Sequence, residues 1–387
     1  MFTRKHFPGL IGIISLSGMF LMAPMCLPLQ ECVDNDWDGY GSPTTTDCVY
    51  AQLDCDDTNP AVNPGALEGP FDHLSCSDGL DNDCNGSTDV QDSSCWEGSN
   101  DANCDDGNRV FPDHNPWNTD VSSYPLHPDS ETFIESIGRA NHLHPDFGTF
   151  WNGVPNGIPY MHVRDDQEKV PVTFYYEDES DPGPYPIPTD VPIEGGPAST
   201  GDRHVLVLDI DNCMLYELFD AWPVDGGRSW EAGSGAIFEL TSNLLRPDGW
   251  TSADAAGLPI YPGLVRYEEV VERGEINHAL RFTVSPTQRG YIHPATHYAS
   301  SRTDPALPPM GLRVRMKASY DCSGFSLEVQ VICTALKKYG MFVADNGSNW
   351  FISGAPDSRW SDENLADLKH IYGNAFEVVF TGEIHTD

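Results

Sequence analysis

The feature that most constrains this chain is an early stretch, residues 31–108, with 19 acidic residues and not one Lys or Arg. Only nine of its residues are Val, Ile, Leu, Met or Phe. Ordering a residue costs about 1–2 kcal/mol of chain entropy, and so little apolar surface cannot offset that cost. Cross-links and bound cations can order such a stretch, so the sequence predicts both.

Short acidic loops of one type recur inside this stretch. The phrase "DNDWDG" places carboxylates at alternate positions, Asp34, Asp36 and Asp38, and then turns on Gly39. Calcium takes about six to eight oxygen ligands, and such a loop points its carboxylates inward. No helical pattern flanks the loop, so we expect calcium loops without EF-hands; the alternative is a disordered acidic linker. The predicted metal ligands are Asp34, Asp36, Asp38, Asp54, Asp56, Asp57, Asp81, Asp83, Asn85, Asp89, Asp101, Asn103 and Asp105.

The order of these loops resembles a known family. "DNDWDGYG", then "DCDDTNPAVNPGALE", then "DGLDNDCNGSTD" resembles the MopE-type metal-binding motif of bacterial surface and secreted proteins, and is similar in style to thrombospondin type 3 calcium repeats. The insertion "TTTDCVYAQL" departs from the pattern. The resemblance implies metal binding and surface display without catalysis. Ca²⁺ at several sites is the expected cofactor. Copper, which a relative binds through a modified Trp, is less favoured, although Trp37 lies in the first loop.

The N-terminus predicts export. Residues 1–26 carry Arg4 and Lys5 and then an apolar run, Leu10 to Ala23, that is short for a membrane span but typical of a signal peptide. Cleavage after Ala23 is expected, and a lipid anchor on Cys26 is the alternative. No later segment has the roughly 20 apolar residues that a transmembrane span needs. We therefore expect a protein that is secreted or held at the bacterial cell surface.

Charge and cysteine content agree with that location. The formal net charge is -38, and a chain so poor in Lys and Arg does not bind nucleic acid, because phosphate binding needs both residues. Eleven cysteines in an exported chain indicate disulfides, and their spacing leaves the pairing open. Seven lie in the acidic stretch, so residues 31–107 are predicted to form an Asp/Cys-rich calcium-binding module.

Residues 109–387 have the pattern of a second, β-rich domain. Short apolar runs bounded by Gly, Pro, Asn or Asp predict antiparallel strands, and we expect a mainly β fold of the β-sandwich or jelly-roll type with a few helices. Helices are predicted over residues 129–138, 326–340 and 361–373. Phrases such as "GWTSADAAGLPIYPGLVRYEE" and "KKYGMFVADNGSNW" resemble a secreted bacterial domain of unassigned activity. The predicted strands are 170–176, 204–210, 213–222, 235–240, 278–284, 312–319, 341–346 and 376–380.

One predicted strand carries a basic face. Arg313, Arg315 and Lys317 alternate with apolar residues, so their side chains share one side of the strand. Guanidinium groups bind carboxylates well, which favours a groove for an anionic, uronate-containing glycan. The alternative is that these charges pair with neighbouring acids or face solvent.

Two further groups of residues are candidates for catalysis. His278, Arg281, His297 and Tyr298 provide the residue types that polysaccharide lyases use to abstract a proton beside a neutralised uronate. Glu217, Glu239 and Asp254 are acidic residues, and two of them could form the pair of carboxyl groups that a glycosidase uses for catalysis. The alternatives are structural histidines and strand acids that point to solvent.

These observations predict a secreted or cell-surface calcium-binding protein. Its β-rich domain is expected to act on extracellular polysaccharide as a glycoside hydrolase or lyase. The alternative is a non-catalytic adhesin or glycan-binding surface protein. In both cases the expected partner is an extracellular glycan or cell-surface polymer.

Overall fold

The computed structural model describes residues 33–42, 48–50, 52–66, 75, 78–88 and 110–386. The chain divides into two compact units, Met1–Pro64 (unit 1) and Gly65–Asp387 (unit 2). Each unit is treated by itself below. Among the described residues, no helix is long and apolar enough to cross a bilayer.

Unit 1 consists of turns rather than helices and sheets over its described residues. A parallel bridge joins Gly41 to Leu53, and the rings of Tyr40 and Tyr50 stack with centroids 4.5 Å apart. The only buried hydrophobic residues among those described here are Tyr40 and Val62. The scarcity of apolar side chains in the sequence therefore results in a unit with almost no hydrophobic core.

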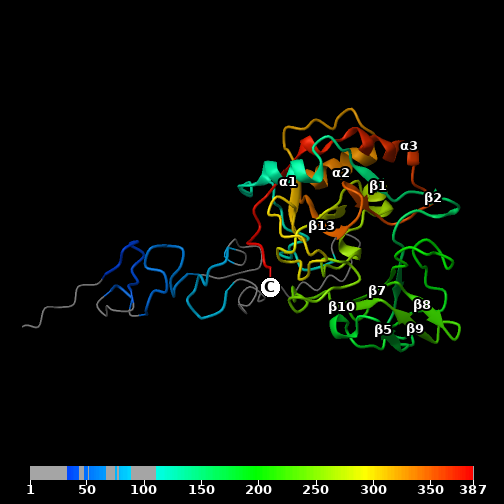
Figure 1. The fold of residues 1–387 in the computed structure, drawn as a ribbon, viewed down its shortest axis with the longest axis horizontal. Coiled ribbons are helices and arrows are strands. Elements are labelled where there is room, and N and C mark those ends of the chain that lie inside the picture. The colour runs from blue at the N-terminus through cyan, green and yellow to red at the C-terminus, as the bar shows by residue number, and fades with distance from the viewer. Residues whose placement is uncertain are drawn as a thin grey trace, which may run out of the picture. The chain divides into compact units, whose positions relative to one another are not determined.

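The described residues are mainly β, with 23% in strands against 15% in helices, which confirms the predicted mainly β class with a few helices. The largest sheet of unit 2 has six strands (Figure 1). The strand pairs β1–β14 and β11–β13 are parallel, whereas the sequence had predicted antiparallel pairing. In sheet order the strands are β1 (His144–Asp146), β14 (Phe351–Ser353), β11 (Leu280–Val284), β13 (Met341–Asn346), β12 (Arg313–Met316) and β15 (Phe376–Val378).

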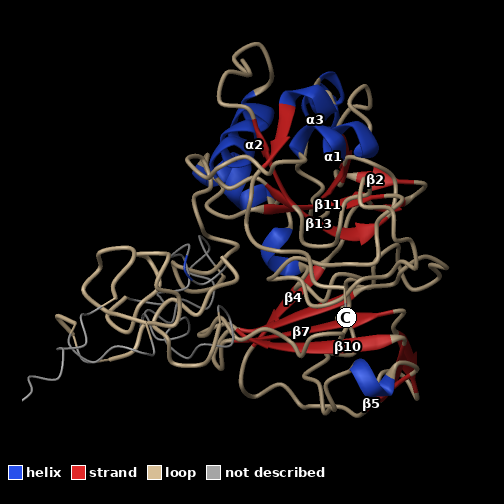
Figure 2. Cartoon of the chain, turned by 60° about the vertical axis from the view of Figure 1, so that its left-hand side comes forward, coloured by secondary structure: helices blue, strands red, loops and turns tan. Residues whose placement is uncertain are grey.

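Three smaller sheets complete unit 2. The four-stranded sheet also contains a parallel pair, β4–β6, and lies on the opposite side of the unit from the three labelled α-helices (Figure 2). Its order is β10 (Ser234–Glu239), β7 (Met214–Phe219), β6 (Val205–Asp209) and β4 (Tyr160–Val163). The others are the sheet β5 (Val172–Phe174), β9 (Ser229–Ala232), β8 (Trp222–Val224) and the hairpin β2 (Phe150–Trp151), β3 (Val154–Pro155).

The three predicted helices are all present. They are α1 (Ser130–Ile137), α2 (Leu327–Lys338) and α3 (Asp362–Leu365), and α3 continues as a 3₁₀ turn, η7 (Ala366–His370). The Ser361 hydroxyl caps α3 by accepting a hydrogen bond from the backbone N–H of Asn364. The described residues also contain the short helical turns η4 (Glu177–Glu179), η5 (Tyr261–Gly263) and η8 (Gly373–Ala375) and the π-helical η6 (Glu268–Arg273).

Strand β6 separates two hydrophobic cores. Its five residues are all buried, because side chains alternate across a strand and both faces of this sheet are covered. Leu206 and Leu208 belong to the large core shared with the six-stranded sheet, and Val205 and Val207 belong to a smaller core on the other face. This packing explains why the sequence here is an unbroken apolar run.

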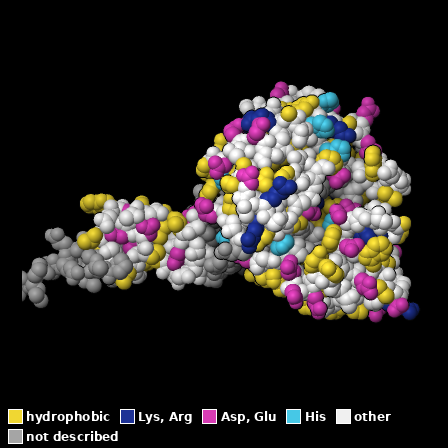
Figure 3. All heavy atoms as spheres, in the orientation of Figure 1, with side chains coloured by type: hydrophobic (Ala, Val, Ile, Leu, Met, Phe, Trp, Pro, Cys, Tyr) yellow, Lys and Arg dark blue, Asp and Glu magenta, His cyan; other side chains and the backbone are white. Residues whose placement is uncertain are grey.

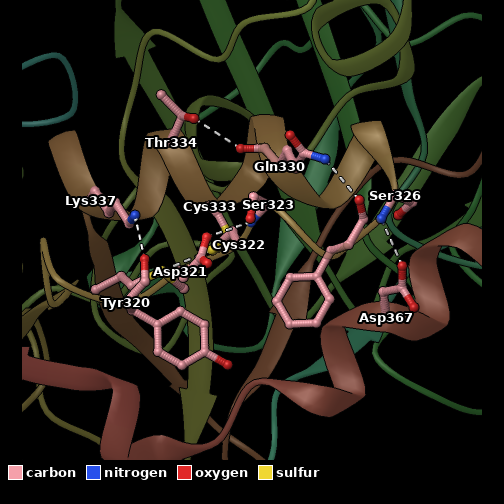
Figure 4. Close-up of a disulfide and its surroundings, with 12 residues drawn as sticks. Tyr320, Asp321, Cys322, Ser323, Ser326, Gln330, Cys333, Thr334, Lys337 and Asp367 are labelled. Carbon is pink, nitrogen blue, oxygen red and sulfur yellow. Dashed lines mark hydrogen bonds between the residues drawn. A yellow bond between two sulfur atoms is a disulfide. The ribbon is translucent and has the colours of Figure 1, made fainter.

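A disulfide between Cys322 and Cys333 fastens helix α2 to the segment before it (Figure 4). Their Cα atoms are 6.6 Å apart. Lys337, in the last turn of α2, donates a hydrogen bond to the backbone carbonyl of Tyr320 at 2.6 Å. Lys337 therefore contacts the same preceding segment as the disulfide.

Candidate functional site

The first acidic loop, "DNDWDG", is held by hydrogen bonds from its backbone to its own aspartates. Asp34 Oδ1 accepts from the N–H of Trp37 at 2.6 Å, and Asp34 Oδ2 accepts from the N–H of Gly39 at 3.0 Å. Asp38 Oδ1 accepts from the N–H of Tyr40 at 2.8 Å. Gly39 has a φ of +97°, a conformation that strains residues with a side chain, so the turn requires glycine here.

Carboxylates from two segments of unit 1 meet at Asp36. Asp34, Asp36 and Asp38 each place one oxygen within 4.8 Å of the others. Asp36, Asp54 and Asp57 do the same. Because Asp36 belongs to both groups, the five carboxylates form one site, which we call the Asp36 cluster.

Backbone pairing and an asparagine hold the second segment against the first loop. The N–H of Asp54 donates to the carbonyl of Gly41 at 3.0 Å, next to the Gly41–Leu53 bridge. Asn35 donates to Asp57 twice, from its backbone N–H at 3.0 Å and from Nδ2 at 2.6 Å. Asn35 therefore orients Asp57 toward the cluster, although the sequence had marked only the alternate acids of this loop as functional.

The Asp36 cluster contains carboxylate oxygens that the described residues leave without a hydrogen bond. They are the Oδ2 atoms of Asp36, Asp38 and Asp54. Asp54 is only 1% exposed, so water does not solvate it freely. A buried anion is costly unless it is paired, and residues 31–108 contain no Lys or Arg to pair with it. The missing partner has the properties of a cation.

The pKa values of two aspartates in the cluster also indicate that their charged forms lack a positive partner. Burial raises the pKa of Asp36 above its usual value, and the charge of Asp38 raises it further. Burial also raises the pKa of Asp54, with Asp38 and Asp36 adding to the effect. A cation would favour the charged forms and reverse these shifts.

The second acidic loop, "DNDCNG", repeats the backbone of the first. Asp81 Oδ2 accepts from the N–H of Gly86, five residues further on, at 2.8 Å. The fourth positions of the two loops, Trp37 and Cys84, have φ of +70° and +56°. The sixth positions, Gly39 and Gly86, both have φ of +97°. The repeated sequence pattern therefore reflects a repeated loop conformation.

Other predicted ligands have different surroundings. Asp56 Oδ1 accepts from the hydroxyl of Thr58 at 2.6 Å, so this carboxylate caps a turn. Asp83 Oδ1 accepts from the backbone N–H of Asn85 at 3.2 Å, and its Oδ2 accepts from Asn85 Nδ2 at 3.0 Å. Four predicted ligands lie outside the described residues: Asp89, Asp101, Asn103 and Asp105.

The cysteines among the described residues are cross-linked rather than free. Besides Cys322 and Cys333, these are Cys48, Cys55, Cys84 and Cys213. A sulfur in a disulfide is not a thiolate and therefore does not bind metal as one. The remaining cysteines, Cys26, Cys32, Cys76, Cys95 and Cys104, lie outside the described residues.

In unit 2, the predicted basic face of β12 binds other parts of the chain. Two nitrogens of Arg313 donate to backbone carbonyls of residues 116–124, at 2.6 and 2.9 Å. Arg315 donates to two more carbonyls of that segment and to Glu377 Oε1 at 2.8 Å. Lys317 Nζ donates to a backbone carbonyl at 3.0 Å. These contacts attach residues 116–124 to the sheet.

The predicted lyase-type residues are distributed among different partners. His278 is buried, and its Nε2 lies 3.2 Å from Glu269, which also pairs with Arg266. Tyr298 accepts a hydrogen bond from Arg289 Nε at 2.9 Å. Arg281 and His297 both lie close to Asp254, as described below. The structure therefore does not join these four side chains into one constellation.

The predicted acids also have different environments. Glu217 is fully buried and accepts hydrogen bonds of 2.9–3.0 Å from the backbone N–H groups of Ile260 and Tyr261, at the start of η5. Burial raises its pKa to about 7 although these hydrogen bonds oppose the shift. Glu239 is exposed and accepts from the hydroxyl of Thr241 at 2.9 Å. Glu217 thus ties the four-stranded sheet to η5.

Asp254 and His297 meet in a cavity of about 390 Å³, which we call the acidic cavity. Asp202 and Asp345 also line it, and the sequence analysis had not selected them. Asp345 stands near the end of β13, where an acid follows an apolar run; this signal could have been read from the sequence. In the space-filling view, acidic side chains lie across the visible face of unit 2 and basic ones are fewer (Figure 3).

A buried ion pair joins Asp254, in the lining of the acidic cavity, to Arg281, which lies behind that lining. Arg281 donates from Nε and Nη2 to Asp254 Oδ2, at 3.2 and 3.0 Å. Asp254 is 1% exposed, and its other oxygen, Oδ1, is buried with no hydrogen-bond partner. Burial raises the pKa of Asp254 to about 7, and the charge of Arg281 opposes this shift.

Comparison with known proteins identifies one part of the chain. Residues 54–89 match the family model Cu-binding_MopE, which is described as a putative metal-binding motif. The match includes the second segment of the Asp36 cluster and the second acidic loop, so the predicted resemblance is confirmed there. The curated proteins and the solved structures contain no match to this chain.

Proposed function

We propose that this protein is secreted or displayed at the cell surface and binds calcium through the Asp36 cluster. The observation that carries the proposal is Asp54, which is almost completely buried and has an Oδ2 atom without a hydrogen-bond donor. A cation at the cluster would satisfy that oxygen together with those of Asp36 and Asp38. The motif matched by residues 54–89 supports metal binding in general.

Calcium is favoured over copper by the chemistry of the ligands. All five side chains of the cluster offer carboxylate oxygens, which suit hard cations. Copper prefers imidazole and sulfur ligands, and the described cysteines are in disulfides. The Asp-x-Asp-x-Asp-Gly order of the first loop also suits the several oxygen contacts that calcium takes.

Bound calcium would also act as the main ordering element of unit 1. This unit buries few hydrophobic residues among those described, so cation binding and cross-links must contribute much of its stability. When ligands converge only in the folded state, the binding free energy of the metal also favours folding.

Calorimetric titration of the full-length, oxidised and metal-free protein tests this proposal. We expect uptake of Ca²⁺ and weaker or no uptake of Cu²⁺ in the same buffer. Chelation should increase protease cleavage within residues 31–64, and added calcium should reverse the effect. Absence of calcium uptake, or a clear preference for Cu²⁺, would refute the assignment.

For unit 2 we propose action on extracellular polysaccharide, as a hydrolase or lyase. The acidic cavity supports this proposal, because Asp254 has a pKa near neutrality and can exchange a proton there, with His297 and Asp345 beside it. Incubation with neutral and acidic polysaccharides tests it, with reducing ends and the ultraviolet absorbance of unsaturated products as readouts. Binding without product would favour the adhesin alternative.

A further inference from the structure

The charged side chains that line the acidic cavity carry mostly negative charge. Carboxylates line it from four separate segments: Glu179, Asp202, Asp254 and Asp345. Among the described residues that line it, none is Lys or Arg. Charges of one sign in a concave site reinforce one another, so the cavity attracts a positively charged ligand.

The serine and threonine hydroxyl groups in the lining already donate their hydrogen bonds within the chain. Ser234 Oγ donates to the carbonyl of Ser252 at 2.6 Å. Ser252 Oγ donates to the carbonyl of Leu258 at 2.6 Å, and Thr251 Oγ1 donates to that of Asp254 at 3.1 Å. These groups are therefore not available as donors to a ligand.

Hydrogen-bond acceptors, by contrast, remain available. Asp254 Oδ1 is buried and has no partner among the described residues. His297 Nδ1 lies 2.8 Å from the carbonyl of Ala255 and so carries the proton, which leaves Nε2 of the neutral ring as an acceptor. Nε2 lies 4.0 Å from the carboxylate of Glu179, beyond hydrogen-bond distance. A suitable ligand must bring its own donors.

Two buried cationic side chains, Arg281 and His204, lie behind the lining and hold Asp254 and its segment in position. Arg281 holds Asp254 through its Oδ2 atom and leaves Oδ1 for a ligand. His204 Nδ1 lies 2.6 Å from Glu194 Oε2, and its Nε2 lies 3.1 Å from the carbonyl of Ala253. Both partners can only accept, so His204 carries two protons and a positive charge next to the segment that bears Asp254.

We propose that the acidic cavity binds an amino sugar in its ammonium form. The ammonium group would be placed at the carboxylates of Asp254 and Asp345, and the sugar hydroxyls would donate to the remaining acceptors. That the ligand is a sugar rests on the polysaccharide function proposed above. Its positive charge rests only on the lining of the cavity.

A bare metal ion fits this cavity less well than it fits unit 1. Among the described residues, the carboxylate and imidazole atoms of the acidic cavity do not bring three ligands within 4.8 Å of one another, as the Asp36 cluster does. The volume of about 390 Å³ is also far larger than one ion requires. A larger organic cation would fill this volume and could contact carboxylates that lie far apart in the lining.

Binding of two matched oligosaccharides to the full-length, calcium-loaded protein tests the proposal. The probes are a glucosamine oligomer and its N-acetylated, neutral counterpart, at about pH 7, where Asp254 is about half charged and an ordinary amino group is still mainly protonated. We expect the charged oligomer to bind at least about tenfold more tightly, corresponding to about 1.4 kcal/mol. Its affinity should fall as salt is added, because salt screens the attraction.

Single substitutions test whether the glucosamine oligomer binds in the acidic cavity. Asp345→Asn and Asp202→Asn should each weaken binding of the glucosamine oligomer about tenfold or more, and both change only one atom of the side chain. Asp225→Asn, at an exposed turn outside the cavity, removes the same charge and should leave binding unchanged. Folding of each variant is checked by its thermal unfolding curve.

The outcomes separate this inference from the proposed function. Equal binding of both oligomers overturns the inference but leaves polysaccharide recognition standing. Failure of both oligomers and of every polysaccharide tested overturns both. Binding of the charged oligomer that Asp345→Asn and Asp202→Asn leave unaffected shows that the site lies elsewhere and also overturns the inference.

Discussion

Asp36 and Asp54 place carboxylate oxygens within 4.8 Å of each other, although they belong to different segments of unit 1. Asp36 lies in the first acidic loop and Asp54 follows the strand-like bridge between Gly41 and Leu53. Each carboxylate has an oxygen without a hydrogen-bond partner among the described residues. Two carboxylates that approach so closely repel each other unless a proton or a cation neutralises one of them, and this relationship makes unit 1 a candidate metal site.

Asp54→Asn should weaken calcium binding about tenfold or more, because it removes a buried anionic ligand. Asp56→Asn is the matched control, since the carboxylate of Asp56 caps Thr58 instead of joining the cluster. Calcium titration of both variants by calorimetry measures the difference. Equal losses in the two variants would show that the cluster does not define the site.

Metal-free unit 1 should lose stability as pH rises above the ordinary Asp pKa. Asp36 and Asp54 have raised pKa values, so the folded unit holds protons at a pH where the unfolded chain has released them. Folding stability then falls as pH rises from the ordinary Asp pKa of 3.8 through the raised pKa values. Hydrogen exchange of residues 33–42 and 52–66, with and without calcium, measures this.

Calcium should suppress that pH dependence at pH values above the raised pKa, because the cation replaces the protons. The expected result is slower exchange with calcium than without it at neutral pH. Protection factors in the metal-free protein that are independent of pH would contradict the coupling between Asp36 and Asp54.

Glu217→Gln should destabilise unit 2 by about 1–3 kcal/mol, because an amide NH₂ would replace one of the oxygens that accept from Ile260 and Tyr261. The control is Glu239→Gln on the neighbouring strand β10. Glu239 is exposed, so a change within about 0.5 kcal/mol is expected. Denaturant unfolding of both variants gives the comparison, and similar effects would argue against a structural role for Glu217.

Unit 2 should also become less stable at alkaline pH as His204 loses its charge. Burial opposes the charge, but Glu194 beside it raises the pKa of His204 to about 9 from an ordinary 6.5. The raised pKa contributes stability that is complete below about 6.5 and lost as pH rises through about 9, at most roughly 3 kcal/mol. The melting temperature recorded as a function of pH shows this loss.

Glu194→Gln should move the alkaline loss to lower pH, since it removes the carboxylate that keeps His204 charged. Glu231→Gln, a change to an exposed acid on β9, is the control and should leave the pH profile in place. An identical profile in the Glu194 variant and the unmodified protein would exclude His204 as the source.

The principal strands and helices of unit 2 could be predicted from local sequence, because their patterns depend on residues that are neighbours in the chain. The run 341–346 is strand β13 with the same bounds, and the lysines of the second predicted helix lie in the last turn of α2. The parallel pairing of β11 with β13 could not be read, since it depends on which distant strand lies alongside. Short strands such as β1 were also missed, because three residues carry too little pattern.

The sequence by itself determined that the early stretch is acidic, poor in apolar residues and built from repeated Asp loops, and these properties predicted both disulfides and bound cations. Only the tertiary structure decided that Asp54 and Asp57 join the first loop while Asp56 does not. It also decided that Arg313 and Arg315 bind the chain's own carbonyls and that Asp254, His297 and Asp345 share a cavity. The physical reason is that composition and periodicity act locally, whereas burial and convergence of charge depend on contacts between segments far apart in the chain.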